Sequence, residues 1–246
     1  MLGAVLIGVA GARGSAQLGG AHVPSAEPAR GAQEPKQAAA PRDAKLEELV
    51  REVASNADRL WARDFRRRGK PYTALESVLI DTPDKADCGP GITLGRPDCF
   101  GTNKAFFDLS FQQALETKYP GEAEGARAFA VAHEVGHHVQ RVLGLDKKVE
   151  ELLAEKPVAS HWIEVHLELQ ADCLAGVWTR RTDQKHLNVP TQIEASIRKT
   201  SEAGTERRLV ERSGETFTYA IPRRRIYWFA QGYAHGEVDD CDTFAP

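Results

Sequence analysis

Two long helical stretches with apolar residues on nearly every face constrain the fold of this chain most strongly. The first runs from about residue 122 to Gly144, and the second from about residue 160 to residue 181. A helix that is apolar all round is buried on more than one side, so both are expected at the centre of a largely helical domain. Polar side chains inside such helices are costly unless they have partners. The polar residues of these two helices are therefore the first candidates for a functional site.

The first helix carries the sequence HEVGH at residues 133–137. His133 and His137 are one helical turn apart, so both imidazoles can reach one metal ion, and Zn²⁺ is the expected cofactor. Glu134 projects past that ion and suits the role of general base for a zinc-bound water. Two histidines on a solvated helix surface are the alternative. The apolar run FAVA at residues 129–132 favours the metal site, because the surroundings are not polar.

A zinc site of this kind needs a third protein ligand and an open fourth position. A third histidine further along the same helix is excluded, because Leu143 occupies its place and Gln140 replaces the expected glycine. Glu168 on the second helix is the better candidate, with Glu164 as the fallback. Asp172 lies one turn after Glu168 and can accept the second N–H of a ligand histidine. A solvated acidic pair is the alternative for Glu168 and Asp172.

The N-terminal residues indicate export from the cytoplasm. Residues 1–16 form a short apolar run followed by small residues, which is typical of a signal sequence or the remnant of a membrane anchor. A disordered apolar tail is the alternative. Residues 17–43 have the composition of a disordered linker, and residues 44–246 that of a folded domain. We therefore predict an extracytoplasmic protein, either secreted, periplasmic or attached to a membrane through its N-terminus.

Four cysteines fit the same compartment, because an even number can close two disulfides under oxidising conditions. Cys88 and Cys99 bracket a loop rich in glycine and proline, and Cys173 and Cys241 are left to each other. We predict both bonds. A thiolate metal site is disfavoured because no pair has the short C-x-x-C spacing.

The predicted fold class is α+β, mainly helical with a small antiparallel sheet. A first helix is expected between Asp43 and Gly69, strands at residues 72–80 and 104–109, and a final helical segment near residues 222–236. The chain has 32 basic and 35 acidic residues, a net charge of −3, which gives no electrostatic reason to expect a nucleic acid partner.

Several strings of this sequence resemble the bacterial putative neutral zinc metallopeptidase family. The resemblance extends from about residue 45 to the end and is carried by AHEVGHHVQ at 132–140, ELQADCLAGVW at 168–178, WF at 228–229, GY at 232–233 and CDTF at 241–244. It implies a zincin-like domain with two active-site helices and a glutamate as third zinc ligand. It also implies an exported or membrane-anchored hydrolase that acts on peptides or proteins.

The sequence departs from this family at one position. The family tends to have Phe-Thr-His-Gly before the last helix and an arginine six residues after the histidine, whereas this chain has Tyr219 at the histidine position and retains Arg225. If that histidine stabilises the oxyanion, the Tyr219 hydroxyl would do so here. Two hypotheses follow: a zinc endopeptidase whose catalytic residues are Glu134, Tyr219 and Arg225, or a catalytically impaired, zinc-stabilised binding or assembly protein of the cell envelope.

Overall fold

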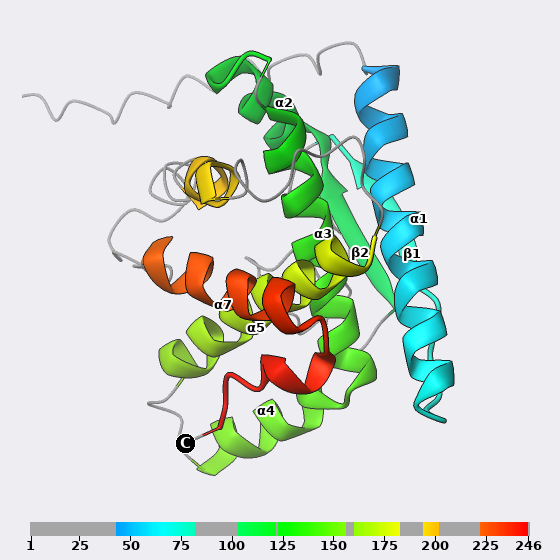
Figure 1. Ribbon diagram of the computed structural model, residues 1–246, viewed down its shortest axis with the longest axis vertical. Helices are drawn as coiled ribbons and strands as arrows, with labels where there is room; N and C mark the ends of the chain where they lie inside the picture. The colour runs from blue at the N-terminus through cyan, green and yellow to red at the C-terminus, as the bar shows by residue number, and fades with distance from the viewer. Residues whose placement is uncertain are drawn as a thin grey trace, which may run out of the picture. The chain divides into compact units, whose positions relative to one another are not determined.

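The computed structural model describes residues 43–81, 103–121, 123–155, 160–182, 194–201 and 222–245, all of them in one compact unit. The described part is mainly helical with a small sheet, which confirms the predicted α+β class (Figure 1). Its elements are α1 (Ala44–Arg67), β1 (Glu76–Ile80), β2 (Lys104–Asp108), α2 (Leu109–Lys118), α3 (Ala123–Val142), α4 (Leu145–Glu155), α5 (Ser160–Arg181), α7 (Pro222–His235) and a 3-10 helix, η3 (Val238–Cys241).

The predicted N-terminal segments, residues 1–16 and 17–43, lie outside the described residues except for Asp43. None of the helices in the described part of the chain combines the length and the hydropathy that crossing a membrane requires.

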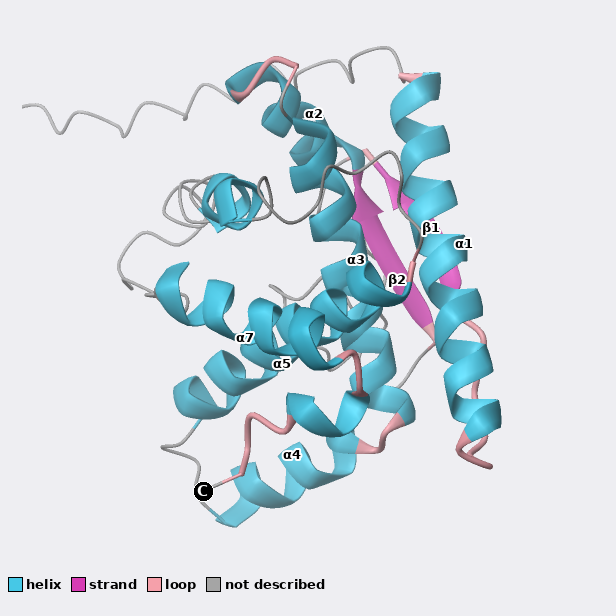
Figure 2. Cartoon of the chain, viewed as in Figure 1, coloured by secondary structure: helices cyan, strands magenta, loops and turns pink. Residues whose placement is uncertain are grey.

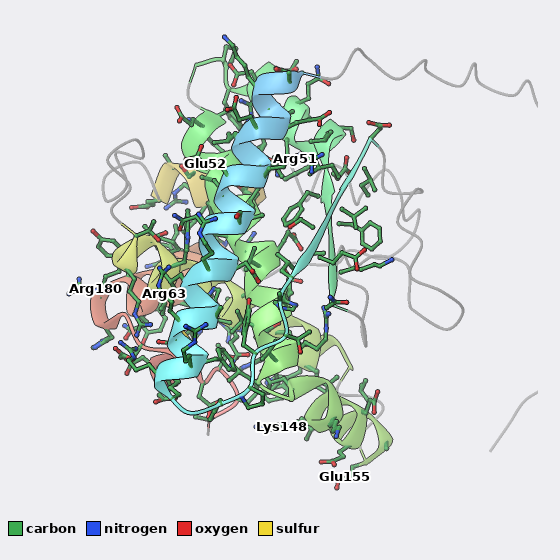
Figure 3. The ribbon with its side chains drawn as sticks, turned by 90° about the vertical axis from the view of Figure 1, so that its right-hand side faces the viewer. Arg51, Glu52, Arg63, Lys148, Glu155 and Arg180 are labelled. Atoms are coloured by element: carbon green, nitrogen blue, oxygen red, sulfur yellow. A yellow bond between two sulfur atoms is a disulfide. The ribbon has the colours of Figure 1, made fainter. Side chains whose placement is uncertain are left out.

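Helix α1 forms where the sequence predicts it. The Asp43 carboxylate caps its first turn by accepting hydrogen bonds from the backbone N–H groups of Lys45 and Leu46, at 3.0 and 3.4 Å. The helix ends before Gly69, whose φ of 65° is readily adopted only by glycine. Charged residues such as Arg51 and Glu52 occupy its exposed face (Figure 3). The opposite face is apolar and packs against α3, through residues that include Val50, Val53, Leu60, Trp61 and Phe65.

The two strands pair in parallel, so the predicted antiparallel sheet was wrong (Figure 2). The register runs from Glu76 opposite Lys104 to Ile80 opposite Asp108. A parallel pair needs a connection of about a dozen residues or more to bring the chain back to the same end of the sheet. Residues 81–103, which join the strands, are long enough for that crossover. Strand propensity predicted both strands but carries no information about their relative direction.

Helix α2 begins directly after β2 and was not predicted. The Asp108 carboxylate caps it, because its Oδ1 accepts hydrogen bonds from the backbone N–H groups of Ser110 and Phe111 at 2.9 and 3.2 Å. Leu109 and Leu115 are buried on its inner side. An aspartate followed by this spacing was the available signal for a helix start.

Helices α3, α5 and α7 form the centre of the described unit, with α5 packed against both of the others (Figure 1). Glycines permit their close approach. A Cβ atom on Gly136 of α3 would lie 2.9 Å from the Ala171 carbonyl oxygen of α5. A Cβ atom on Gly232 of α7 would lie 1.9 Å from the Cys173 carbonyl oxygen. Both predicted apolar helices, α3 and α5, are thus buried on more than one side, as their sequences require.

The C-terminal segment is held against α5 by covalent and polar contacts. A disulfide joins Cys173 to Cys241, which confirms one of the two predicted bonds. The Thr243 hydroxyl donates to the His166 carbonyl oxygen at 2.7 Å, and His166 Nδ1 contacts the Thr243 carbonyl oxygen in return. The predicted bond between Cys88 and Cys99 lies outside the described residues.

A second polar cluster fastens this segment to α1. The buried Asp64 carboxylate accepts hydrogen bonds from Arg68 at 2.7 Å and from Arg181 at the end of α5. The same two arginines reach Glu237, at 3.2 and 2.7 Å. The basic residues that end α1 and α5 therefore serve as ion-pair partners within the fold.

Candidate metal centre

Three ligand atoms from two helices converge on one point. His133 and His137 lie on α3, and Glu168 lies on α5. The two imidazole Nε2 atoms are 3.2 Å apart, and Glu168 oxygens lie 3.2 Å from His133 Nε2 and 3.6 Å from His137 Nε2. Ligand atoms bound tetrahedrally to zinc at about 2.0–2.1 Å are separated by roughly 3.3–3.4 Å. The side chains therefore fit a zinc ion without rearrangement and leave one coordination position for a non-protein ligand.

Close helix packing brings these ligands together. His133 and His137 face α5 because they are one turn apart on the same side of α3. Gly136, next to His137, lies directly against the backbone of Ala171 on α5. A side chain at this position would push the helices apart and move Glu168 away from the histidines. The glycine of the HEVGH segment therefore has a structural role in assembling the ligand set.

The outer nitrogen of His133 is held by a buried carboxylate. His133 Nδ1 lies 2.8 Å from Asp172 Oδ1, and Asp172 has no solvent exposure. Arg225 of α7 grips the same carboxylate with two hydrogen bonds, Nε to Oδ2 at 2.8 Å and an Nη to Oδ1 at 2.7 Å. This geometry directs His133 Nε2 toward the metal position.

The charges around His133 shift its protonation equilibrium. Burial acts to lower the pKa of the His133 imidazole, but the carboxylates of Asp172 and Glu168 raise it to about 10. Burial also acts to raise the pKa of Asp172, and Arg225 and His133 together hold it below its usual value. Without a metal the site therefore favours a proton on His133 Nε2, which a bound cation would replace.

The outer nitrogen of His137 is held differently. His137 Nδ1 lies 2.9 Å from the side-chain oxygen of Gln140, which is itself buried. The Gln140 amide nitrogen donates to the Leu167 carbonyl oxygen at 2.7 Å and to the Gln170 side-chain oxygen at 3.1 Å. Because both of those atoms are acceptors, the Gln140 oxygen must face His137, and the imidazole donates to it.

Glu134 and His138 flank the ligands on α3. Glu134 is only partly buried although the residues on either side of it are buried, and its charge contributes to raising the pKa of Arg225. His138 Nε2 donates to the Thr73 carbonyl oxygen at 2.8 Å and so fastens the chain ahead of β1 to α3. His138 therefore serves packing, whereas Glu134 remains available at the rim of the metal centre.

Comparison with known proteins agrees with this donor set. The family model described as putative neutral zinc metallopeptidase matches residues 1–244. The chain belongs to this family. For this neutral zinc metallopeptidase, the family and the His-His-Glu cluster together imply zinc as the metal.

Relatives of this neutral zinc metallopeptidase occur in distant bacteria. The uncharacterized protein YpfJ of Escherichia coli is 29% identical over 198 residues, which cover 78% of this chain and 69% of YpfJ. The uncharacterized protein Rv2575 of Mycobacterium tuberculosis is 31% identical over 210 residues, with 78% of this chain and 69% of Rv2575 covered. No solved structure matches the chain significantly.

The structure brings together five of the residues singled out in this neutral zinc metallopeptidase: His133, His137, Glu168, Asp172 and Arg225. Arg225 was expected among the catalytic residues, and its hydrogen bonds to Asp172 support a positioning role behind His133. Tyr219 and the side chain of the fallback ligand Glu164 lie outside the described residues.

Two residues of the metal centre, Gln140 and Gln170, were not predicted. The available signal was their polarity within helices that are otherwise apolar. Gln140 also lies three residues after His137, a spacing that places it on the same face of the helix.

Proposed function

We propose that this protein is a zinc-dependent endopeptidase that acts on peptide or protein substrates. The convergence of His133, His137 and Glu168 next to Glu134 carries the proposal. Membership of the zinc metallopeptidase family supports the same reaction class.

Bound zinc would supply Lewis-acid chemistry, polarising the scissile carbonyl and lowering the pKa of a water molecule to about 7. Glu134 accepts the proton of the attacking water and later delivers it to the leaving amine. Asp172 keeps the proton of the neutral His133 imidazole on Nδ1, so that Nε2 is free to bind metal. Arg225 acts through Asp172, and the Tyr219 hydroxyl stabilises the oxyanion.

The proposed place of action is outside the cytoplasm. The Cys173–Cys241 disulfide supports this, because such bonds persist mainly in oxidising compartments. The apolar residues 1–16 support export or attachment to a membrane. Neither the charge balance nor the metal centre favours a nucleic acid as partner.

Glu134→Gln tests the reaction most directly. The variant keeps all three metal ligands, so it should bind one zinc per chain while casein cleavage falls by about 100-fold or more. Glu124→Gln is the matched control, because it makes the same change at an exposed position of α3 and should leave cleavage unchanged. Zinc is measured by metal analysis, and cleavage with and without a chelator. Full cleavage by Glu134→Gln would exclude the mechanism.

Glu168→Ala separates metal binding from the reaction. Loss of the third ligand should abolish stoichiometric zinc as well as cleavage. A wild-type chain that binds zinc, cleaves no member of a broad panel of unfolded proteins and gains no activity from Tyr219→His would instead support the binding or assembly role. Tyr219 is the feature that keeps this second function in view.

A further inference from the structure

A row of buried side-chain amides connects the metal centre to the C-terminal segment. His137 donates to Gln140, Gln140 donates to Gln170, and Gln170 Nε2 donates to the Cys241 carbonyl oxygen at 2.8 Å. Gln140 is 4% exposed and Gln170 is 6% exposed, so water does not compete for these bonds. Every link has one donor and one acceptor, and the row ends on a backbone group that cannot change its role.

We infer that Gln140 and Gln170 are positioning residues for metal binding. Gln140 holds His137 with its proton on Nδ1 and its Nε2 toward the metal, and Gln170 prevents the Gln140 amide from turning. The inference rests on the zinc-binding part of the proposed function and does not depend on peptide hydrolysis. It also makes the segment tied down by the Cys173–Cys241 bond part of the support of the metal centre.

A neutral acceptor suits this position because the centre already contains buried charge. Asp172 is fully buried, and the Glu168 side chain is 13% exposed. A carboxylate at position 140 would add another negative charge in a region of low dielectric, where only Arg225 is available as a buried cation among the residues that hold the two histidines. The amide fixes the histidine proton without that penalty.

Removing the amide leaves a defined defect. In Gln140→Met the side chain keeps its length, but the His137 Nδ1–H loses its acceptor in a dry interior. The imidazole then rotates or moves its proton to Nε2, the atom required by the metal. Loss of a hydrogen bond that orients a ligand typically lowers metal affinity by about 10–100-fold.

Zinc affinity of the full chain, measured by competition with a chromophoric chelator, tests the inference. Gln140→Met should bind zinc about 10–100-fold more weakly, and Gln170→Met should show a smaller loss, because the acceptor remains but is no longer fixed. Gln112→Met is the matched control. Gln112 is a buried glutamine on α2 whose side-chain oxygen has no hydrogen-bond partner among the described residues, so zinc affinity should not change.

A spectroscopic measurement separates positioning from general packing. In the zinc-loaded wild type, the His137 Nδ1 proton should give a slowly exchanging NMR signal, and this signal should disappear in Gln140→Met. Unchanged zinc affinity and an unchanged signal in Gln140→Met would overturn the inference, as would an equal loss of affinity in Gln112→Met. If Gln140→Met does not fold, Gln170→Met decides in the same way.

The result is distinguishable from failure of the proposed function. A wild-type chain that binds no zinc would remove the metal centre and this inference together. A chain that binds zinc but cleaves nothing would remove the peptidase and leave the role of the two glutamines intact.

Discussion

The two ligand histidines lie one helical turn apart on α3 and have opposite kinds of support. His133 is backed by charge, through Asp172 and the Arg225 guanidinium of α7. His137 is backed by neutral amides, through Gln140 and Gln170. One pair of helices thus carries an ionic arm and an amide arm to the same metal position.

The difference teaches how each arm would fail. A buried ion pair is strongly dependent on both partners, because removing one leaves an uncompensated charge. A buried amide that loses its partner leaves only an unsatisfied dipole. The ionic arm also fastens α7 to the site, whereas the amide arm fastens the segment that contains Cys241. Folding of the centre and fixation of the C-terminal segment are therefore linked through different ligands.

The largest difference is expected from Arg225→Met. Without the guanidinium, the Asp172 carboxylate remains buried with a single partner, so the free energy of unfolding of the zinc-free protein should fall by about 3–5 kcal/mol. Gln170→Met, which removes one amide from the other arm, should lower it by only about 1–3 kcal/mol. Urea denaturation of the two variants and the wild type measures both values.

The double variant Asp172→Asn with Arg225→Met provides the control. Removing both charges should restore part of the stability lost in Arg225→Met, because no uncompensated charge remains. If Arg225→Met were no more destabilising than Gln170→Met, the distinction between an ionic and an amide arm would have no energetic basis.

An intermediate effect is expected from Cys173→Ala combined with Cys241→Ala. The disulfide closes a sequence separation of 68 residues. Its removal should lower the free energy of unfolding by about 2–4 kcal/mol, measured by denaturation under non-reducing conditions. Because the Cys241 carbonyl is the acceptor for Gln170, zinc affinity should also fall, through the amide arm.

A double-mutant cycle identifies the arm responsible. Adding Gln170→Met to the cysteine variant should lower zinc affinity little further, because both changes break the same connection. Adding Arg225→Met should lower it by its full separate amount. Equal additivity in both combinations would contradict the proposed link between the disulfide and the amide arm.

Much of the metal centre was predictable because its signals are local. The spacing of His133 and His137 fixes their common helix face, and Glu168 with Asp172 repeats that spacing on the second helix. The apolar periodicity and caps also predicted α1, α3 and α5. These features depend on residues within one or two turns of each other.

Features that depend on distant residues were not predictable in the same way. The direction of the β1–β2 pair follows from the path of the connection and not from the composition of either strand. The grip of Arg225 on Asp172 joins residues 53 positions apart, and the bond from Gln170 to Cys241 joins residues 71 apart. Sequence periodicity marks such residues as unusual but does not pair them.

The smallest effect on the metal centre is expected from Asp64→Asn, which removes a buried carboxylate outside both arms. Burial acts to raise the pKa of Asp64, but Arg181 and Arg68 hold it below its usual value. A depressed pKa stabilises the fold above the unfolded-state pKa of about 3.9, and this contribution is lost as pH falls through the folded-state value. The stability difference between wild type and Asp64→Asn, measured by denaturation, should therefore be full at neutral pH and shrink below about pH 4. Zinc affinity at neutral pH should not change. If Asp64→Asn weakened zinc binding as much as Arg225→Met, loss of any buried ion pair would suffice, and the ionic arm would have no specific role in holding His133.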